Sequence, residues 1–432
     1  MGLGVHGGGV GVVQYLAKRG AKLRVTDLKT ASELASSLEK LSSLPVDFTL
    51  GKHRPHDFLE AEIVIRNPDV PQSSPFLKIA KDNGARIEME SSIFFKELPS
   101  LSKTIGITGT KGKTTTTLLI YQMLKEAGEK AVVGGNLEIS LLELLPQIDK
   151  ETWVVIELSS WQAEGLEICR KSPHIAVVTN IFPDHLNRYR NMKSYLEAKK
   201  LILKYQNRND YKLLNKNNSY TPELALSSPS KSFFFDKEKL NPKIHQYTTL
   251  LGEHNLENLA AMEMTGKILG IKEEIMVKTV KKFSPPPHRL EEVRKIGEIT
   301  FYNDSAATNP NAAEAAISSF GQKPIIWILG GADKNLKFEK LANTSLGENI
   351  KAAILLSGSA TKKIEEAFEK AEVSFPLFGP YDSLEKAVKK AYLLAKKEKN
   401  GIVILSPAAA SFGMFKNEFE RGEKFKQIVS LL

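Results

Sequence analysis

The sequence predicts an α/β protein of three domains, each built on a mostly parallel sheet flanked by helices. Short apolar runs of strand length alternate along the chain with longer segments whose apolar residues recur at helical spacing. Several strand-like runs end in acidic or small residues, as strands do when their carboxyl ends bind ligands. The length of 432 residues leaves room for about three domains of roughly 150 residues each.

The composition narrows the classes of function. Apolar residues make up 42% and charged residues 25% of the chain, as in ordinary globular proteins. The one cysteine, Cys169, excludes an internal disulfide and suits a reducing compartment. The apolar runs are too short to cross a membrane and residues 1–20 lack the pattern of a signal peptide, so we expect a cytoplasmic protein without a membrane partner. A monomer is expected as well, although no sequence pattern determines the oligomeric state. The net charge is +10, but the lysines are spread over helical segments, so we expect no nucleic-acid partner.

Residues 1–99 are expected to form a Rossmann-like domain. Gly2–Gly7 matches the pattern G-x-G-x-x-G, and a strand expected at 22–26 ends at Asp27, the spacing that holds the phosphates and ribose of a nucleotide. The motif normally follows a strand, yet only Met1 precedes it, so either the chain start is truncated or the first strand of this sheet is missing. Further strands of the unit are expected at 63–65 and 86–88.

The central domain, expected over residues 100–286, begins with a phosphate-binding loop. A strand at 104–108 leads into a glycine-bearing turn, and apolar residues at helical spacing follow from Lys113 onward. Backbone amides of the turn and the N-terminus of the helix would face a phosphate. The Lys113 ammonium would reach the outer phosphate oxygens, and Thr114 is placed to hold Mg²⁺. The loop is a variant of the P-loop ATPase pattern, because its first glycine is displaced.

Two further strands are expected to bring polar side chains to this loop. The strands expected at 153–156 and 175–178 are followed by Glu157 and by Asn180, Asp184 and His185, respectively. Because ligands bind outside the carboxyl ends of parallel strands, these side chains should converge on the phosphate loop. Taken singly, Glu157 could be a capping or surface carboxylate and His185 a structural histidine. Beside a loop that needs Mg²⁺, a magnesium site is the better interpretation.

The remainder of the central domain changes in character. Residues 206–245 are rich in asparagine, serine and proline around short strands near Leu213 and 233–235, a pattern typical of a small loop-rich β appendage. A helix is expected at 255–269, and Pro285–Pro287 then marks a domain boundary.

Residues 287–432 are expected to form a second Rossmann-like α/β domain, without a phosphate loop. Strands expected at 325–329, 354–356 and 402–405 are each followed by small residues, and a helix is expected at 384–395. This alternation favours another doubly wound sheet.

A series of stretches, in order along the chain, carries a family resemblance: Gly109–Thr114, Gly134–Asn136, Glu157–Gln162, Asn180–Tyr189, His254–Asn255 with Asn258, His288–Arg289, Asn303–Ser305, Gly330–Gly331 with Lys334, and Leu405–Ser411. In these stretches the chain resembles the Mur ligases, ATP-dependent amino-acid ligases of peptidoglycan precursor synthesis. The resemblance spans essentially the whole chain. Glu157–Gln162 and Leu405–Ser411 are most similar to the members that add D-glutamate.

The resemblance implies three ligand sites. ATP would contact Gly109, Thr110, Lys111, Gly112, Lys113, Thr114 and Thr115, with Asn258, Arg289 and Asp304 at its adenine and ribose. The uridine diphosphate part of a UDP-N-acetylmuramoyl-L-alanine substrate would contact Val5, His6 and Asp27, and its muramoyl part would contact Asn136 and His185. The carboxylates of D-glutamate would be held by Thr308, Lys334 and Ser411.

The resemblance also implies the chemistry. The L-alanyl carboxylate would attack the γ-phosphate of ATP, and the amine of D-glutamate would displace phosphate from the resulting acyl phosphate. The catalytic residues would be Lys113, Glu157, His185 and Lys199. Two Mg²⁺ ions would be held by Thr114, Glu157, His185 and Lys199, the last as a carbamate formed with CO₂; Lys200 is the neighbouring alternative.

Four positions depart from the family's usual residues: Asp69 stands for glycine, Trp161 for phenylalanine, Ala306 for lysine and Glu418 for an aromatic residue. Three alternatives remain at this point. A folate polyglutamate ligase belongs to the same superfamily, the glycine motif of residues 2–7 alone would suit an NAD-dependent dehydrogenase, and the charge alone would suit a nucleic-acid-binding ATPase.

Overall fold

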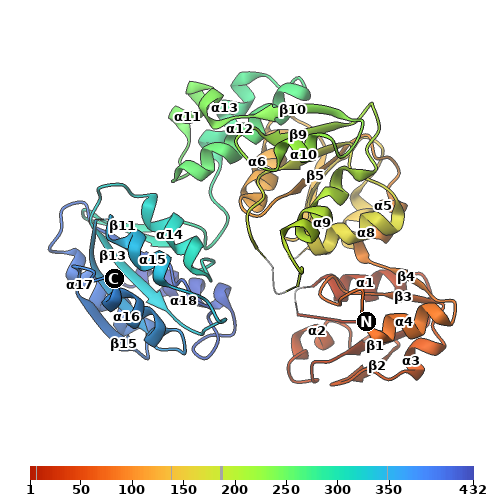
Figure 1. Ribbon diagram of the computed structural model, residues 1–432, viewed down its shortest axis with the longest axis horizontal. Coiled ribbons are helices and arrows are strands. Elements are labelled where there is room, and N and C mark those ends of the chain that lie inside the picture. The colour runs from red at the N-terminus through yellow and green to blue at the C-terminus, as the bar shows by residue number, and fades with distance from the viewer. Residues whose placement is uncertain (6, 138, 185–187, 348) are drawn as a thin grey trace. The chain divides into compact units, whose positions relative to one another are not determined.

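The computed structural model describes residues 1–5, 7–137, 139–184, 188–347 and 349–432, and it confirms the predicted α/β class. The chain forms two compact units (Figure 1). Unit 1 comprises Met1–Thr248 with Leu256–Phe283, and unit 2 comprises Thr249–Asn255 with Ser284–Leu432. The finer division into three domains, at residues 99 and 286, stays a prediction. In the part of the chain that the structure describes, no helix is long and apolar enough to cross a membrane.

The first part of unit 1 contains two pairs of parallel strands with helices between them. Its elements are α1 (Gly8–Ala17), β1 (Leu23–Asp27), α2 (Ala35–Glu39), β2 (Val46–Leu50), α3 (His56–Leu59), β3 (Ile63–Ile65), α4 (Pro75–Asp82), β4 (Arg86–Glu88) and α5 (Glu90–Glu97). β1 pairs with β2, and β3 pairs with β4.

The opening residues link these two pairs. Gly2 N donates to Thr26 O of β1 (2.8 Å), and the amino group of Met1 donates to Ile65 O of β3 (2.9 Å). Asn67 N donates back to Met1 O (2.9 Å). Among the described residues α1 is the first helix or strand, and Met1 and Gly2 before it form the hydrogen bonds that a short central strand would form.

The second part of unit 1 is built on a six-stranded parallel sheet in the order β10-β9-β8-β5-β7-β6. Its strands are β5 (Thr104–Thr108), β6 (Ala131–Gly135), β7 (Trp153–Glu157), β8 (Ile175–Val178), β9 (Tyr211–Asn215) and β10 (Lys231–Phe235). Its helices are α6 (Lys113–Glu126), α7 (Leu141–Leu144), α8 (Ser160–Cys169), α9 (Met192–Lys204), α10 (Thr221–Ala225), α11 (Pro242–Tyr247), α12 (Glu253–Ile268) and α13 (Glu273–Lys282).

The prediction of a separate β appendage was wrong. β9 pairs in parallel with β8, and β10 pairs in parallel with β9, so both strands extend the main sheet. Leu213 and Leu214 of β9 are fully buried. The polar residues around these strands belong to the connections of a parallel crossover, and the local sequence pattern does not reveal which strand is the partner.

Unit 2 contains a second six-stranded sheet, in the order β11-β12-β16-β13-β14-β15. Its strands are β11 (Glu291–Ile296), β12 (Ile299–Asn303), β13 (Ile325–Gly330), β14 (Ile350–Leu356), β15 (Leu377–Tyr381) and β16 (Ile402–Leu405). Its helices are α14 (Pro310–Ser318), α15 (Glu339–Ser345), α16 (Thr361–Lys370), α17 (Leu384–Ala395) and α18 (Glu418–Ser430). Among the described strands of this sheet, only β11 runs antiparallel to its neighbour, and helices pack on both faces through separate apolar cores.

The two large sheets place their functional loops in the same way. The adjacent strands β8, β5 and β7 end at one edge of the first sheet, and the adjacent strands β12, β16 and β13 end at one edge of the second. Ligands of doubly wound proteins bind at such edges.

Candidate active site

The predicted phosphate loop connects β5 to α6. Gly109 has φ of 149°, and a Cβ added there would lie 1.9 Å from Thr179 Oγ1, so only glycine fits. Gly112 has φ of 80° and occupies the N-cap of α6, where it offers no side chain to the first helical amides. These amides and the helix dipole therefore remain available to an anion.

Asn180 holds the loop in place from the end of β8. Its backbone oxygen accepts from Thr110 N, and its side-chain oxygen accepts from Lys111 N, both at 2.8 Å. The predicted convergence of this strand end on the loop is thus observed.

Lys113, Thr114 and Thr115 form the first turn of α6. Lys113 Nζ donates to the carbonyl oxygens of Gly109 and Thr110, both at 3.1 Å, so the ammonium lies over the loop. Thr114 is half-buried beside it and Thr115 is buried. This is the placement expected for a cation that follows the outer phosphates and for a hydroxyl that contacts a metal ion.

Asn258 of α12 also lies against the loop. Its side-chain oxygen accepts from Thr116 Oγ1 at 3.2 Å, and a Cβ added to Gly112 would lie 2.1 Å from the same oxygen. The structure therefore brings this predicted ATP residue next to the start of α6.

Glu157 ends β7 with a carboxylate that is 1% exposed. Its Oε1 accepts from Asn136 Nδ2 at 2.9 Å, whereas its buried Oε2 accepts no hydrogen bond from the residues that the structure describes. A buried carboxylate oxygen without a partner is costly, and a cation would remove the cost. With the Thr114 hydroxyl in the first turn of α6, after the neighbouring strand β5, the donor set consists of hard oxygens and fits Mg²⁺.

Lys199 of α9 lies beneath the phosphate loop and is 2% exposed. Its Nζ donates to Gly109 O (2.6 Å) and Thr108 Oγ1 (3.3 Å). Burial and the nearby Lys113 cation lower the pKa of Lys199 well below its ordinary value. The alternative, Lys200, instead forms ion pairs with Glu197 and Glu223 at the helix surface.

The predicted uridine site has Asp27 at its centre. Asp27 Oδ2 accepts from Gly4 N (3.0 Å) and Oδ1 accepts from Lys29 N (2.8 Å), so the buried carboxylate shapes the glycine turn. Val5 follows that turn and is 40% exposed. Gly7, with φ of 86°, precedes α1 and again leaves the first helical amides without a side-chain cap.

Asp304 follows β12 in unit 2. Its carboxylate accepts from Ser406 Oγ (2.7 Å) and from Leu290 N (3.2 Å), and burial raises the pKa of Asp304 to about 7. Arg289, the neighbour of Leu290, is exposed, so Asp304 fixes the turn that presents this arginine.

The three predicted amino-acid-binding residues follow three adjacent strands. Thr308 follows β12, Ser411 follows β16 and Lys334 follows β13. The loops after β13 and β16 are joined by two bonds between Ala332 and Ala410, of 2.8 and 3.1 Å. Lys334 is exposed and Thr308 half-buried, whereas Ser411 is 2% exposed and its hydroxyl has no hydrogen-bond partner in the described chain.

Arg421 of α18 was missed by the sequence analysis. It is fully buried and donates from Nε to Ser305 Oγ (2.9 Å), from Nη2 to Ser305 O (2.9 Å) and from Nη1 to Ala409 O (3.3 Å). Burial lowers the pKa of Arg421 to about 10, so its charge persists at neutral pH beneath these strand ends. A lone arginine among the charges of a surface helix gives no local signal.

Some predicted residues are not brought together here. His6 and His185 lie outside the described residues. The predicted ATP residues are divided between the units, with 109–115 and Asn258 in unit 1 and Arg289 and Asp304 in unit 2. Within the described ranges no three His, Cys, Asp or Glu side chains form a metal cluster.

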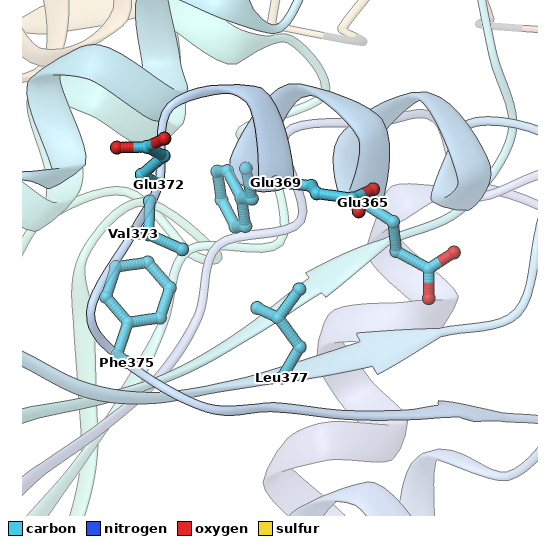
Figure 2. Close-up of a pocket in the computed structure, with 7 residues that line it drawn as sticks. Glu365, Glu369, Glu372, Val373, Phe375 and Leu377 are labelled. Carbon is cyan, nitrogen blue, oxygen red and sulfur yellow. The ribbon is translucent and has the colours of Figure 1, made fainter.

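One cavity in unit 2 lies away from the candidate site. Figure 2 shows it beside the end of α16 and the start of β15, with an apolar floor and glutamates along the helix. It measures about 480 Å³ and is lined by Glu365, Phe368, Glu369, Glu372, Val373, Phe375 and Leu377. It therefore lies at the amino end of a strand, and none of the predicted site residues lines it.

The chain matches models of known protein families over most of its length. These are the Mur ligase MurD-like N-terminal domain over residues 1–88, the Mur ligase middle domain over 107–249 and the Mur ligase glutamate ligase domain over 288–409. The UDP-N-acetylmuramoylalanine–D-glutamate ligase of Roseiflexus sp. (strain RS-1) is 43% identical, over 99% of this chain and 97% of that protein. The protein of the same name from Clostridium tetani is 37% identical, over 99% and 95%.

Solved structures share the fold at lower identity. The UDP-N-acetylmuramate-alanine ligase of Thermotoga maritima aligns with a TM-score of 0.63 and 18% identity, over 100% of this chain and 98% of that one. The MurF ligase of the same organism, solved with ADP, aligns with a TM-score of 0.58 and 18% identity, over 87% and 99%. With the phosphate loop, the buried glutamate and the full-length sequence similarity, these findings establish that the chain belongs to the Mur ligase family.

Proposed function

We propose that this chain joins D-glutamate to UDP-N-acetylmuramoyl-L-alanine in peptidoglycan precursor synthesis, with ATP as the energy source. The observation that carries the proposal is the full-length similarity to ligases named for this reaction. The family consists of ATP-dependent amino-acid ligases that use Mg²⁺. The chain is further proposed to act in the cytoplasm as a monomer on these small-molecule substrates.

The proposed chemistry begins with attack of the L-alanyl carboxylate on the γ-phosphate of ATP, which releases ADP and forms an acyl phosphate. The loop amides and the N-terminus of α6 bind the phosphates, and Lys113 follows the charge of the transferred group. Thr114 and Glu157 would hold Mg²⁺, which neutralises phosphate charge when bound.

In the second step, the amine of D-glutamate attacks the acyl carbon and forms the amide bond. The bond between the acyl carbon and the phosphate oxygen breaks, and inorganic phosphate leaves with its electron pair. We propose that Ser411, Lys334 and Thr308 hold the carboxylates of D-glutamate. Two observations support this placement: the buried hydroxyl of Ser411 has no hydrogen-bond partner among the described residues, and the loops after β13 and β16 are hydrogen-bonded to each other. The persistent charge of Arg421 beneath the same strand ends adds to the attraction for an anion.

Lys199 is proposed to react with CO₂ and form a carbamate. The carbamate would help His185 to hold a second Mg²⁺. A lysine must lose its proton before its nitrogen attacks CO₂, and the lowered pKa of Lys199 favours that loss. Lys199 is buried beside the loop, whereas Lys200 is engaged by two glutamates at the surface, and this contrast favours Lys199.

Acetate rescue tests the carbamate. Lys199→Ala should be inactive and should recover part of its rate when acetate or another short carboxylate occupies the vacated space. Lys200→Ala is the matched control and should keep the wild-type rate without acetate. Absence of rescue, with full wild-type activity in CO₂-free buffer, would identify Lys199 as an ordinary amine.

The proposed reaction itself is tested by incubating the protein with ATP, Mg²⁺, UDP-N-acetylmuramoyl-L-alanine and one amino acid at a time. The product of D-glutamate addition should appear by mass spectrometry, with one phosphate released for each amide bond. Equal rates with other amino acids would overturn the assignment of D-glutamate. Activity on a folate acceptor instead would favour the folate polyglutamate ligase.

A further inference from the structure

We propose that Arg188 is a positioning residue that fixes the loop 66–72, and with it the predicted uridine site, at a set place relative to the phosphate loop. The inference rests on the proposed function, because it concerns where the nucleotide part of that substrate is held.

Arg188 is held by contacts on two sides. Its Nη1 donates to Asp69 O (2.9 Å) and its Nη2 to Pro68 O (2.6 Å), so one guanidinium holds two consecutive carbonyl groups of the loop 66–72. On the other side its Cζ lies 4.4 Å from the ring centroid of Trp161 on α8. The planar guanidinium suits both contacts at once, and a lysine would not reproduce them.

A buried ion pair holds the same loop from beneath. Arg66 Nη2 lies 2.5 Å from Glu164 Oε2 of α8, and the Arg66 side chain is 2% exposed. Arg66 Nη1 donates to Val70 O (2.8 Å), and Gln72 Nε2 donates to the same Glu164 oxygen (3.2 Å). Glu164 Oε1 lies 3.7 Å from Arg188. Both ends of the loop are therefore bonded to the central sheet's helix α8, and Arg188 fixes its middle.

The loop 66–72 supports the glycine turn of the predicted uridine site. A Cβ added to Gly2 would lie 2.9 Å from Asn67 Cβ, so the turn packs directly on Asn67. Asn67 N also donates to Met1 O (2.9 Å), and Gly4 of the same turn donates to Asp27. A shift of the loop would thus move the turn and the carboxylate that it binds.

One segment of the chain reaches both sites. Asn180, at the start of the segment after β8, holds the amides of the phosphate loop, and Arg188, later in the same segment, holds the loop 66–72. Arg188 also lies against Trp161 and near Glu164 of α8, the helix that follows β7 of the central sheet, so the loop 66–72 is anchored to the same sheet that carries the phosphate loop. Misplacement by about 1 Å can cost roughly 100-fold in rate.

The test compares Arg188→Ala and Arg188→Lys with Arg190→Ala, a control at an exposed arginine two residues away. Kinetics are measured with the complete acceptor and with an acceptor that lacks the uridine monophosphate part. With the complete acceptor, both Arg188 variants should lose about 10- to 100-fold in kcat/KM, mostly through KM, while the KM of ATP is unchanged. With the shortened acceptor, they should match wild type and the control.

Equal losses on both acceptors would show a general structural defect, and full activity of Arg188→Lys would show that charge alone suffices; either result overturns the proposal. Hydrogen exchange of residues 66–72 in the ligand-free proteins should be faster in Arg188→Ala than in wild type and Arg190→Ala, and equal exchange would also overturn it. Because the exchange measurement needs no substrate, it tests the contact between Arg188 and the loop 66–72 even if the wild type does not use the proposed acceptor.

Discussion

The two six-stranded sheets carry polar side chains at equivalent edges but treat buried charge in opposite ways. At the edge of the central sheet, Glu157 Oε2 is buried without a hydrogen-bond partner in the described chain, and the Lys199 amine is buried near the Lys113 cation. At the edge of the sheet in unit 2, the buried Arg421 donates hydrogen bonds to three oxygen atoms, and Asp304 accepts from Ser406 and Leu290.

This difference separates a site for chemistry from a site for binding. Uncompensated buried charges destabilise the protein alone and are kept where a ligand, a metal ion or a reaction completes them. Satisfied polar networks instead fix the geometry of loops without any ligand. We therefore expect substitutions in the central edge to cost activity but little stability, and substitutions in the hydrogen-bonded network of Arg421 at the edge of unit 2 to cost stability first.

The largest expected effect is on turnover in Lys113→Ala. The loop amides can still bind phosphate, but no cation follows the transferred charge, so kcat should fall by about 10³-fold or more. Circular dichroism should show an unchanged fold. Phosphate release with both substrates present measures the loss, and a variant that keeps more than about a tenth of the wild-type kcat would contradict the role of Lys113.

The second largest expected effect is a loss of stability in Arg421→Met. The substitution leaves the carbonyl oxygens of Ser305 and Ala409 without the bonds that Arg421 donates, and no other donor reaches either oxygen in the described chain. Leaving buried acceptors unpaired should cost about 2–4 kcal/mol of unfolding free energy. Chemical denaturation measures this loss of unfolding free energy, and hydrogen exchange in β12 and β16 shows whether the loss lies in unit 2. A loss below about 1 kcal/mol would show that the network is not a stabilising one.

Lys199→Met should change the unfolding free energy in the opposite direction and stabilise the protein. Gly109 O keeps its bond from Lys113 Nζ, and Thr108 Oγ1 keeps its donation to Leu158 O (2.7 Å), so no described partner is left unpaired. The variant should be inactive yet more stable by about 1–2 kcal/mol at pH 7, because burying the Lys199 amine costs free energy, either to desolvate its charge or to remove its proton, and an apolar side chain of similar volume costs neither.

The pH dependence provides the control for Lys199→Met. The folded-state pKa of Lys199 is lowered, so the unfolded chain binds more protons and the stability of the wild type rises with pH toward the ordinary lysine pKa of 10.5. The advantage of the variant should therefore shrink as the pH rises through that window. An advantage that is constant with pH would mean that Lys199 is charged in the folded protein and that its pKa is not lowered.

Sequence reasoning succeeded where the signal is local. The strands β5, β7 and β8 and the start of α6 were predicted within about two residues, because an apolar run, a glycine turn and helical spacing adjoin one another in the chain. By the general rule for parallel strands, Asn180 was predicted at the phosphate loop, which it contacts, and Glu157 at the end of β7, the strand beside β5.

It failed where the deciding contact is distant in the sequence. Arg66 and Glu164 are 98 residues apart, and Arg421 and Ser305 are 116 apart, so neither pair forms a motif. β9 and β10 were assigned to an appendage because their polar surroundings were visible and their parallel partner, β8, was not. Tertiary packing decides such cases, and local propensity does not.

Ser411→Ala should have the smallest effect on stability and should still weaken substrate binding. The Ser411 hydroxyl is buried and has no partner in the described residues, so removing it takes away no hydrogen bond and should change the unfolding free energy by less than about 0.5 kcal/mol. If that hydroxyl donates to a carboxylate of D-glutamate, the KM for D-glutamate should rise about 10-fold, equivalent to one hydrogen bond to a charged group, with the KM of ATP unchanged. Ser345→Ala is a matched control, because Ser345 is an equally buried serine of the same unit whose hydroxyl already donates to Leu341 O (2.7 Å) within α15. That control should keep the wild-type KM. A Ser411 variant with an unchanged KM for D-glutamate would place the amino acid elsewhere and leave the unpaired hydroxyl without a ligand.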